Sequence, residues 1–170
     1  MAAAVPTAGF AVYVIFVKPA ISKAETSAKR FAKQAELTQM QDAIESYKTK
    51  NGEYPPNATA PEINRHLKAV FGSEHDLDSL QEKTSLDFSN LDERESIWFW
   101  LNGHSTRMIL GDRVRGLMYD CRPKHFTDID NVGLMEYTSA DGEYFVIRDG
   151  KALLLDPVTN QAKSAVEFEN

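Results

Sequence analysis

The sequence predicts an α+β fold in which a long N-terminal helix packs against a small antiparallel β-sheet with one or two short helices. Residues 21–50 contain neither Gly nor Pro and are rich in Ala, Lys, Glu and Gln, which are strong helix formers. The C-terminal third holds Asp-Gly turn signals at 141–142 and 149–150, between short runs of strand-forming residues. Two shorter helical patterns lie between these parts.

The long predicted helix carries two kinds of apolar residue. Its first half has small residues that recur with one aromatic at three- or four-residue steps: Ala24, Ala28, Phe31, Ala32 and Ala35. Its second half has larger residues at steps of three, four and three: Leu37, Met40, Ile44 and Tyr47. The first set predicts close approach by other helices, and the second predicts a stripe that packs on a globular layer. Asn51-Gly52 predicts the end of the helix, which would then be about 45 Å long.

An uncharged apolar run precedes this helix at 2–17 and ends at Lys18-Pro19. It is shorter than the roughly twenty residues that a full membrane span needs. It lacks the basic start and the cleavage site of a signal peptide. We interpret it as the tail end of a membrane helix. Without this run, the helix would equally fit an ordinary amphipathic helix in a soluble bundle.

Five short segments follow one another in order: PAISKA at 19–24, AKR at 28–30, LTQM at 37–40, NGEYPP at 51–56 and SIWFWLNG at 96–103. Their order and spacing resemble the stalk and head of type IV pilin-like proteins, especially the major, G-type pseudopilins of type II secretion systems. The resemblance covers about a third of the chain.

The resemblance implies a non-enzymatic structural subunit of a type II secretion pseudopilus or a type IV pilus-like filament. Residues 1–52 would form the apolar segment and the stalk helix, and residues 53–170 the head. The subunit would be anchored in the inner membrane by a single pass, with its head on the periplasmic side. It would assemble by helix–helix packing with copies of itself and other pilin-like subunits, on a secretion assembly platform. The alternative is a membrane-tethered binding or receptor module that uses the β-rich head.

The start of the chain departs from the family pattern. The family's mature chain begins with a Phe-Thr-Leu-like sequence and a glutamate at its fifth position, after a basic leader that ends in Gly. The sequence shows neither feature, so we expect either a start upstream of Met1 or a member without the processing site. Five basic residues follow the apolar run: Lys18, Lys23, Lys29, Arg30 and Lys33. The positive-inside rule alone would then place the head in the cytoplasm. We favour the side that the resemblance implies, because a missing basic leader would explain the asymmetry.

The predicted head begins with a helix at 62–71, followed at 73–90 by a loop with one helical turn. A second helix is predicted at 91–101, with Asp92 as its N-cap. Its aromatic cluster Trp98-Phe99-Trp100 is interpreted as core, with one ring exposed because adjacent residues cannot all face one way on a helix. A short strand or irregular loop follows at 107–120. Three strands are predicted to form a meander at 132–137, 143–148 and 151–155, and a polar tail at 157–170.

The residue inventory gives little support to catalysis or to nucleic acid as a partner. The net charge is −6 and the isoelectric point is near 5.2, which argues against nucleic acid. Cys121 is the only cysteine, so no intrachain disulfide can form, and pairing with His125 as a thiol–imidazole couple is disfavoured. The four histidines show no metal-ligand spacing and are predicted at the surface: His66, His75, His104 and His125.

One cation site is a hypothesis. Asp128 and Asp130 supply oxygen donors at positions one and three of a calcium-type loop, with Gly133 at position six. Glu136 or Asp141 could complete the ligand set. The resemblance adds weight, because G-type pseudopilins have a calcium site in their C-terminal loops. The simpler interpretation, which we favour, is a polar turn. No other cofactor is predicted.

Overall fold

The computed structural model describes residues 18–56, 60–84, 86–88, 91–103, 105, 109, 125–128 and 133–168. Its longest element is α2 (Lys18–Asn51), one uninterrupted helix of 34 residues. At about 1.5 Å per residue this helix is roughly 50 Å long. Within the described ranges, no helix is both long enough and apolar enough to cross a membrane. The apolar run at 2–17, which we interpreted as part of a membrane helix, lies outside those ranges.

The stalk helix α2 ends where the sequence predicts. Gly52 follows it with φ 85°, a left-handed conformation that costs glycine little. The Gly52 N–H donates a hydrogen bond of 2.7 Å to the carbonyl of Lys48, which closes the last turn.

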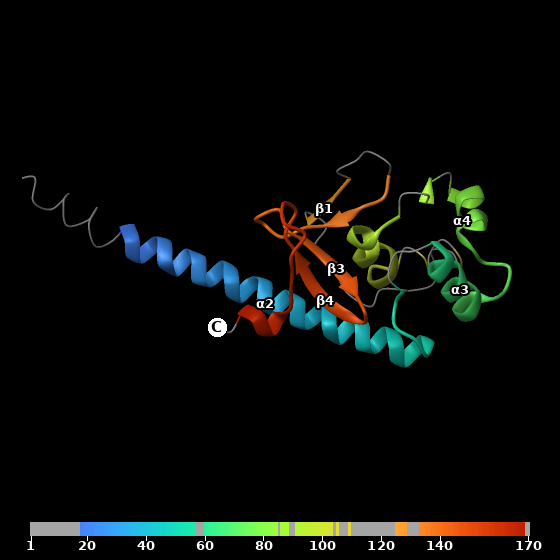
Figure 1. The fold of residues 1–170 in the computed structure, drawn as a ribbon, viewed down its shortest axis with the longest axis horizontal. Helices are drawn as coiled ribbons and strands as arrows, with labels where there is room; N and C mark the ends of the chain where they lie inside the picture. The colour runs from blue at the N-terminus through green and yellow to red at the C-terminus, as the bar shows by residue number, and fades with distance from the viewer. Residues whose placement is uncertain are drawn as a thin grey trace, which may run out of the picture.

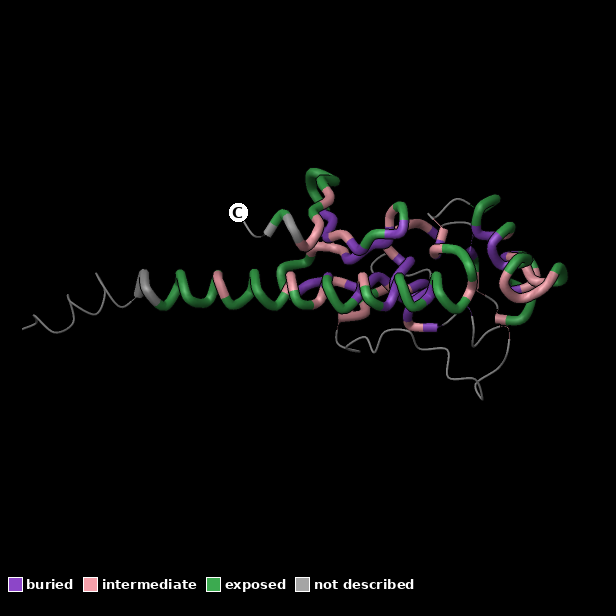
Figure 2. Tube along the Cα trace, turned by 90° about the horizontal axis from the view of Figure 1, so that it is seen from below, coloured by how far each residue is buried: buried purple, intermediate pink, exposed green. Residues whose placement is uncertain are grey.

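The two halves of α2 have different surroundings. Its N-terminal part projects beyond the rest of the molecule, as Figure 1 shows, and the tube of Figure 2 is green, or exposed, over most of that part. Beyond that part, α2 packs against β4, η4 and η6. The four residues of the predicted stalk-to-head stripe are all buried there: Leu37, Met40, Ile44 and Tyr47. Apolar residues of the head complete the same core.

Two helices follow the stalk. α3 (Ala60–Phe71) begins two residues before the predicted helix and buries Ile63 and Leu67. α4 (Leu77–Thr84) corrects the prediction of a loop with one helical turn at 73–90. Asp76 precedes α4, and its carboxylate accepts a hydrogen bond from the Ser79 N–H at 3.0 Å. Because Asp76 caps the helix and two leucines of α4 are buried, a helix of eight residues is stable here.

The predicted helix at 91–101 is instead two short pieces. η3 (Glu93–Glu95) is a 3₁₀ helix with Asp92 as its N-cap, as predicted, in a complete capping box with Glu95. η4 (Ile97–Leu101) is a π-helical turn, closed by a hydrogen bond from the Asn102 N–H to the Ile97 carbonyl.

The prediction that one aromatic ring of η4 is exposed is wrong. Trp98, Phe99 and Trp100 are 4%, 0% and 2% exposed. α2, β2 and β3 all contact η4, so the segment is enclosed on several sides. A helix that is apolar all round is buried in this way, whichever direction each side chain faces.

The predicted meander is split between two small antiparallel sheets. β1 (Phe126–Thr127) pairs with β2 (Glu136–Tyr137), and β3 (Tyr144–Arg148) pairs with β4 (Lys151–Leu155). A single bridge between Thr138 and Tyr144 links the two sheets. β4 has the predicted bounds, and the Asp149-Gly150 turn has the expected positive φ values of 52° and 72°. Residue 132, where the first strand was predicted to begin, lies outside the described part.

The segment predicted as a polar tail is partly structured. β5 (Ala162–Lys163) pairs with β4, so the second sheet has three strands in the order β3, β4, β5. η6 (Ala165–Phe168) then lies against α2. Pairing with β4 supplies hydrogen-bond partners for the backbone of β5. The polar residues of this segment gave no sign of that pairing, so the sequence predicted a tail.

Candidate functional site

The first half of α2 presents the residues that were predicted to pack against other helices. They are all exposed: Ala24, Ala28, Phe31, Ala32 and Ala35. Phe31 is 61% exposed, and Ile21, which the prediction omitted, is 45% exposed. Ile21 precedes Ala24 by three residues and extends the same spacing, so its position in the sequence could have identified it. These six residues are called the stalk stripe below.

The stalk stripe faces away from the head. Ala28 and Leu37, Phe31 and Met40, and Ala35 and Ile44 are nine positions apart in each case. Nine residues are about two and a half turns of an α-helix, so the two members of each pair lie on opposite sides. Leu37, Met40 and Ile44 are buried against the head. Ala32 is the exception, because it lines a pocket together with His125 and Asp141 of the head. The other five residues of the stalk stripe are therefore open to a partner that approaches from the side opposite the head.

A cluster of charges fixes the head to the middle of the stalk. Lys33 lies 2.6 Å from Asp141 and also contacts Glu143, and Lys29 lies 3.1 Å from Asp141. Burial acts to lower the pKa of Lys33, but its hydrogen bonds to Asp141 and Glu143 outweigh burial and raise the pKa. The hydrogen bonds from Lys33 and then Lys29 lower the pKa of Asp141. Both shifts favour the charged forms of Lys33 and Asp141.

Hydrogen bonds of two further residues of α2, Glu36 and Gln41, also attach the stalk to the head. Tyr137 donates a hydrogen bond of 2.5 Å to Glu36. Gln41 donates from Nε2 to the Gly150 carbonyl at 3.0 Å and accepts from the Ala152 N–H at 2.9 Å. The Gln41 amide thus binds the β3–β4 hairpin through both of its polar atoms. Sequence reasoning missed these residues, since their partners lie more than a hundred positions away.

His66 is buried, which corrects the prediction that it lies at the surface. It is 0% exposed, and its Nε2 lies 2.9 Å from the hydroxyl of Tyr47. The edge of the Trp100 ring packs against it, and its Nδ1 lies 3.5 Å from Glu53. Burial lowers the pKa of His66, so the imidazole is neutral at pH 7. His75 and His125 are half-buried, and His104 lies outside the described residues.

Glu95 is a second buried ionisable group. It is 1% exposed, and burial raises its pKa to about 8, with the neighbouring Asp92 adding to the rise. Hydrogen bonds from Arg94 outweigh the effect of burial on Asp92 and lower its pKa. The pair therefore holds one proton, on Glu95, near neutral pH.

The structure describes three of the four residues proposed for calcium. Asp128 accepts a hydrogen bond from the Gly133 N–H at 3.1 Å, and its Oδ1 is buried with no hydrogen bond, which fits a cation ligand. Glu136 is fully buried, whereas Asp141 is paired with Lys29 and Lys33. Among the described residues, no three His, Cys, Asp or Glu side chains gather as metal ligands do. Asp130 lies outside those residues, so calcium binding stays a prediction.

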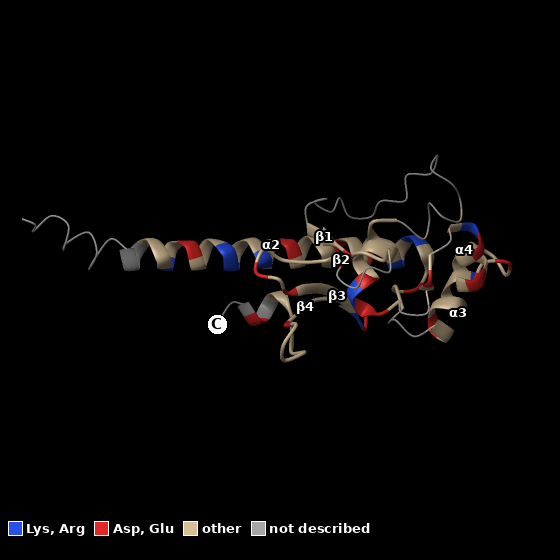
Figure 3. Ribbon diagram, turned by 90° about the horizontal axis from the view of Figure 1, so that it is seen from above, with Lys and Arg blue, Asp and Glu red and all other residues tan. Residues whose placement is uncertain are grey.

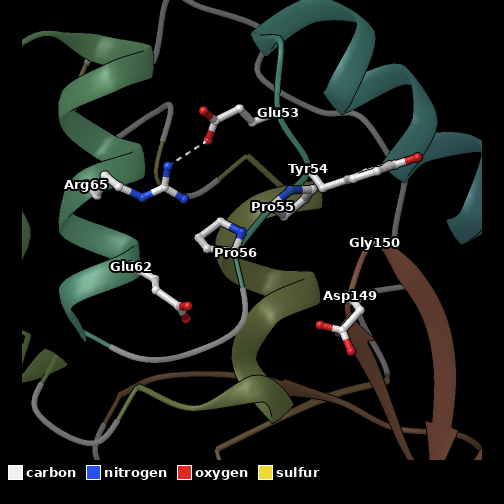
Figure 4. A pocket seen from close by; sticks show the side chains of 8 residues that line it. All are labelled: Glu53, Tyr54, Pro55, Pro56, Glu62, Arg65, Asp149 and Gly150. Carbon is white, nitrogen blue, oxygen red and sulfur yellow. Dashed lines mark ion pairs between the residues drawn. The ribbon is translucent and has the colours of Figure 1, made fainter.

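A pocket of about 290 Å³ lies where the end of the stalk, α3 and the β3–β4 turn meet. Figure 4 shows its lining: Glu53, Tyr54, Pro55, Pro56, Glu62, Arg65, Asp149 and Gly150. Arg65 and Glu53 form an ion pair of 3.5 Å across it. Its walls are charged and proline-rich. Trp98 and Trp100 do not line it, because both are buried in the core.

Comparison of the chain with protein-family models, with curated proteins and with solved structures finds no match.

Proposed function

We propose that the protein is a non-enzymatic, pilin-like structural subunit. In this proposal it assembles through its stalk into a filament of the type II secretion pseudopilus or type IV pilus kind. Its partners are copies of itself and other pilin-like subunits, on an assembly platform at the inner membrane. A single pass before α2 would anchor it there, with the head on the periplasmic side.

One observation carries the proposal: α2 is continuous through two environments. Its second half is buried under the head, while its first half exposes Phe31 and Ile21 together with small residues on the side opposite the head. Exposed large apolar side chains in one row favour burial against another molecule. Alanines at helical spacing let a second helix backbone approach closely, and the spacing of three and four residues suits packing along a shared axis.

The second candidate, a receptor module, has less support. It would need an apolar pocket formed by the aromatic cluster of η4. Trp98, Phe99 and Trp100 fill the core instead, and the pocket beside α3 has charged walls. That pocket leaves the receptor function as an alternative only for a charged ligand.

Cross-linking between copies tests the proposal. Full-length chains carrying Ala24→Cys or Ala28→Cys, with Cys121→Ser, are oxidised mildly at matched concentration. We expect disulfide-linked dimers from both, because the stalk stripe brings equivalent positions of two copies together. Thr159→Cys is the control, since Thr159 is also exposed but lies on the turn before β5. Dimers that form no more readily from Ala24→Cys than from Thr159→Cys would argue against a stalk-assembled subunit.

A further inference from the structure

His66 of α3 lies where the end of the stalk, α3 and η4 meet. Figures 1 and 3 place α3 at the end of the molecule opposite the projecting part of the stalk. The His66 ring stacks on Tyr47 of α2 with their centroids 5.7 Å apart, and the Trp100 ring of η4 meets it edge-on at 5.2 Å. The side chain of His66 is 1% exposed, whereas that of Glu53, which follows α2, is 48% exposed. A buried titratable ring thus adjoins a carboxylate that water can reach.

The two ring nitrogens of His66 have different neighbours. Nε2 lies 2.9 Å from the Tyr47 hydroxyl, whereas Nδ1 is buried without a hydrogen bond and lies 3.5 Å from Oε2 of Glu53. Burial raises the pKa of Tyr47, so its hydroxyl keeps its proton and can donate to Nε2. The neutral ring then carries its own proton on Nδ1, on the side of the carboxylate. A donor and a carboxylate therefore face each other slightly beyond hydrogen-bond distance.

The same oxygen of Glu53 has a second neighbour, which is a permanent cation. Nη1 of Arg65 also lies 3.5 Å from Oε2 of Glu53, as the dashed line in Figure 4 marks. The Arg65 side chain is 65% exposed, and an ion pair so open to water contributes little to stability. Arg65 is always charged, whereas His66 is charged only after it takes up a proton. One carboxylate oxygen therefore lies at equal distances from a permanent cation and a conditional one.

The connector at 53–56 joins the stalk to α3 through neighbouring side chains. The Tyr54 hydroxyl donates a hydrogen bond of 3.0 Å to Glu45 and accepts one of 3.2 Å from Lys48, which holds the connector to α2. Glu53 reaches α3 instead, through Arg65 and His66. A change in the partner of Glu53 therefore changes how firmly α3 is held to the end of the stalk.

We propose that His66 forms a proton-controlled contact: when its ring is protonated, Glu53 leaves Arg65 and accepts a hydrogen bond from Nδ1–H. The proton comes from solvent and adds to Nε2, and the Tyr47 hydroxyl turns from donor to acceptor. The positive charge is then shared by both ring nitrogens, so Nδ1–H becomes a stronger donor to the carboxylate. A largely buried contact replaces an exposed one, so acid fastens the connector to α3. The inference does not rest on the proposed function.

The groups around the ring place this change at acidic pH. Burial against Tyr47 and Trp100 lowers the pKa of His66 below 6.5. Among the described residues, two charged groups act on the ring: the Glu53 carboxylate raises its pKa, and the charge of Arg65 lowers it. Glu53 therefore offsets part of the cost of charging a buried ring, and Arg65 competes with the ring for Glu53.

An NMR titration of the His66 ring in the full chain tests the inference in four forms: the parent chain, E53Q, R65Q and the double variant. We expect E53Q to lower the pKa of His66 by about 0.5 or more, because the ring loses its carboxylate. R65Q should raise the pKa in the parent chain, because Glu53 is then no longer shared. In the E53Q background R65Q should raise it clearly less, since only the charge of Arg65 is removed there.

Two further measurements complete the test. Below the pKa of His66, the Nδ1–H proton should give a visible signal in the parent chain and exchange faster with water in E53Q, which lacks the charged acceptor. Glu62→Gln is the matched control, because it removes a carboxylate from the same pocket and should change the pKa of His66 much less than E53Q does.

Two outcomes would overturn the inference. One is a His66 pKa or an Nδ1–H exchange rate that E53Q leaves unchanged, because Glu53 would then not bind the protonated ring. The other is an equal effect of R65Q with and without Glu53, because Arg65 would then act through its charge alone and would not compete for the carboxylate. Glu53 and Arg65 are both exposed at their side chains, so the variants should fold, and their backbone amide spectra check this.

Discussion

The ammonium group of Lys33 lies 2.6 Å from the carboxylate of Asp141 and joins the middle of α2 to the turn that precedes β3. The Lys33 side chain is only 15% exposed, and it contacts Glu143 as well. Two carboxylates therefore converge on one largely buried cation. From this point towards Asn51 the stalk packs against the head, and towards Lys18 it projects beyond the head (Figure 1). Lys33 marks the boundary between the two halves.

Lys33→Met should weaken the attachment of stalk to head. The substitution keeps most of the side-chain volume but leaves Asp141 and Glu143 next to each other without their shared cation. We expect the free energy of unfolding, measured with urea, to fall by about 1–2 kcal/mol. Lys29→Met is the control, because its side chain is 61% exposed and a surface pair contributes little. Equal losses for the two variants would contradict a special role of Lys33.

Glu95 should make the fold sensitive to alkaline pH. Burial raises its pKa to about 8 in the folded state, above the ordinary value of 4.5. Folding therefore favours the protonated carboxyl. The stability contribution is complete below pH 4.5 and is lost as pH rises towards and through 8. Urea unfolding between pH 6 and 9 should show the free energy of unfolding decline over this range.

Glu95→Gln separates this effect from other titrations. A glutamine can still accept the hydrogen bond that Glu95 receives from the Asp92 N–H at 2.7 Å. It carries no proton that can be lost, so the alkaline decline should be smaller and the variant should be more stable than the parent at pH 9. A decline as steep as that of the parent chain would show that another group is responsible.

His66 should act in the opposite direction, at acidic pH. Burial beside Tyr47 and Trp100 lowers its pKa below the ordinary value of 6.5, and the charge of Arg65 adds to the fall. The carboxylate of Glu53 acts against this shift without reversing it. Folding favours the neutral ring, so this contribution is present above pH 6.5 and is lost as pH falls below it. An NMR titration of the ring should place its pKa below 6.5. His66→Gln should remove the corresponding part of the acid-induced loss of stability.

The sequence predicted the elements whose signals are local. β4 and its turn follow from alternating apolar residues and from Asp149-Gly150, and α2 follows from its composition and its end at Gly52. α4 was missed although its cap was readable, since Asp76 stands three residues before Ser79. The π-helical turn of η4 was not predictable, because it depends on enclosure by three other elements.

The residues of the candidate site also fall into those that the sequence could predict and those that it could not. The residues of the stalk stripe could be named from their spacing alone, since exposure and helical position are nearly local properties. The burial of His66 could not, because its partner Tyr47 lies nineteen residues away on another helix. The partner of Glu95 is local, since Asp92 lies three residues before it, but the burial of Glu95 comes from the packing of η3 against β2 and β3. The ion pairs of Lys33 join residues more than a hundred positions apart. The sequence shows which residues are charged, but it does not show that Lys33 pairs with Asp141 and Glu143.

Phe31→Ser should reduce self-association without weakening the fold. Phe31 is 61% exposed on the projecting half of α2, so its ring contributes little to the head's core. In a stalk-to-stalk contact the same ring would be buried, where an aromatic side chain contributes roughly 1.5–3 kcal/mol. We therefore expect about a tenfold or larger rise in the dissociation constant between copies, measured by analytical ultracentrifugation of the full chain in detergent. The urea unfolding curve should move little.

Val158→Ser is the control, since Val158 is 89% exposed but lies on the turn between β4 and β5. Association that weakens equally in both variants would indicate nonspecific hydrophobic contact rather than packing along the stalk.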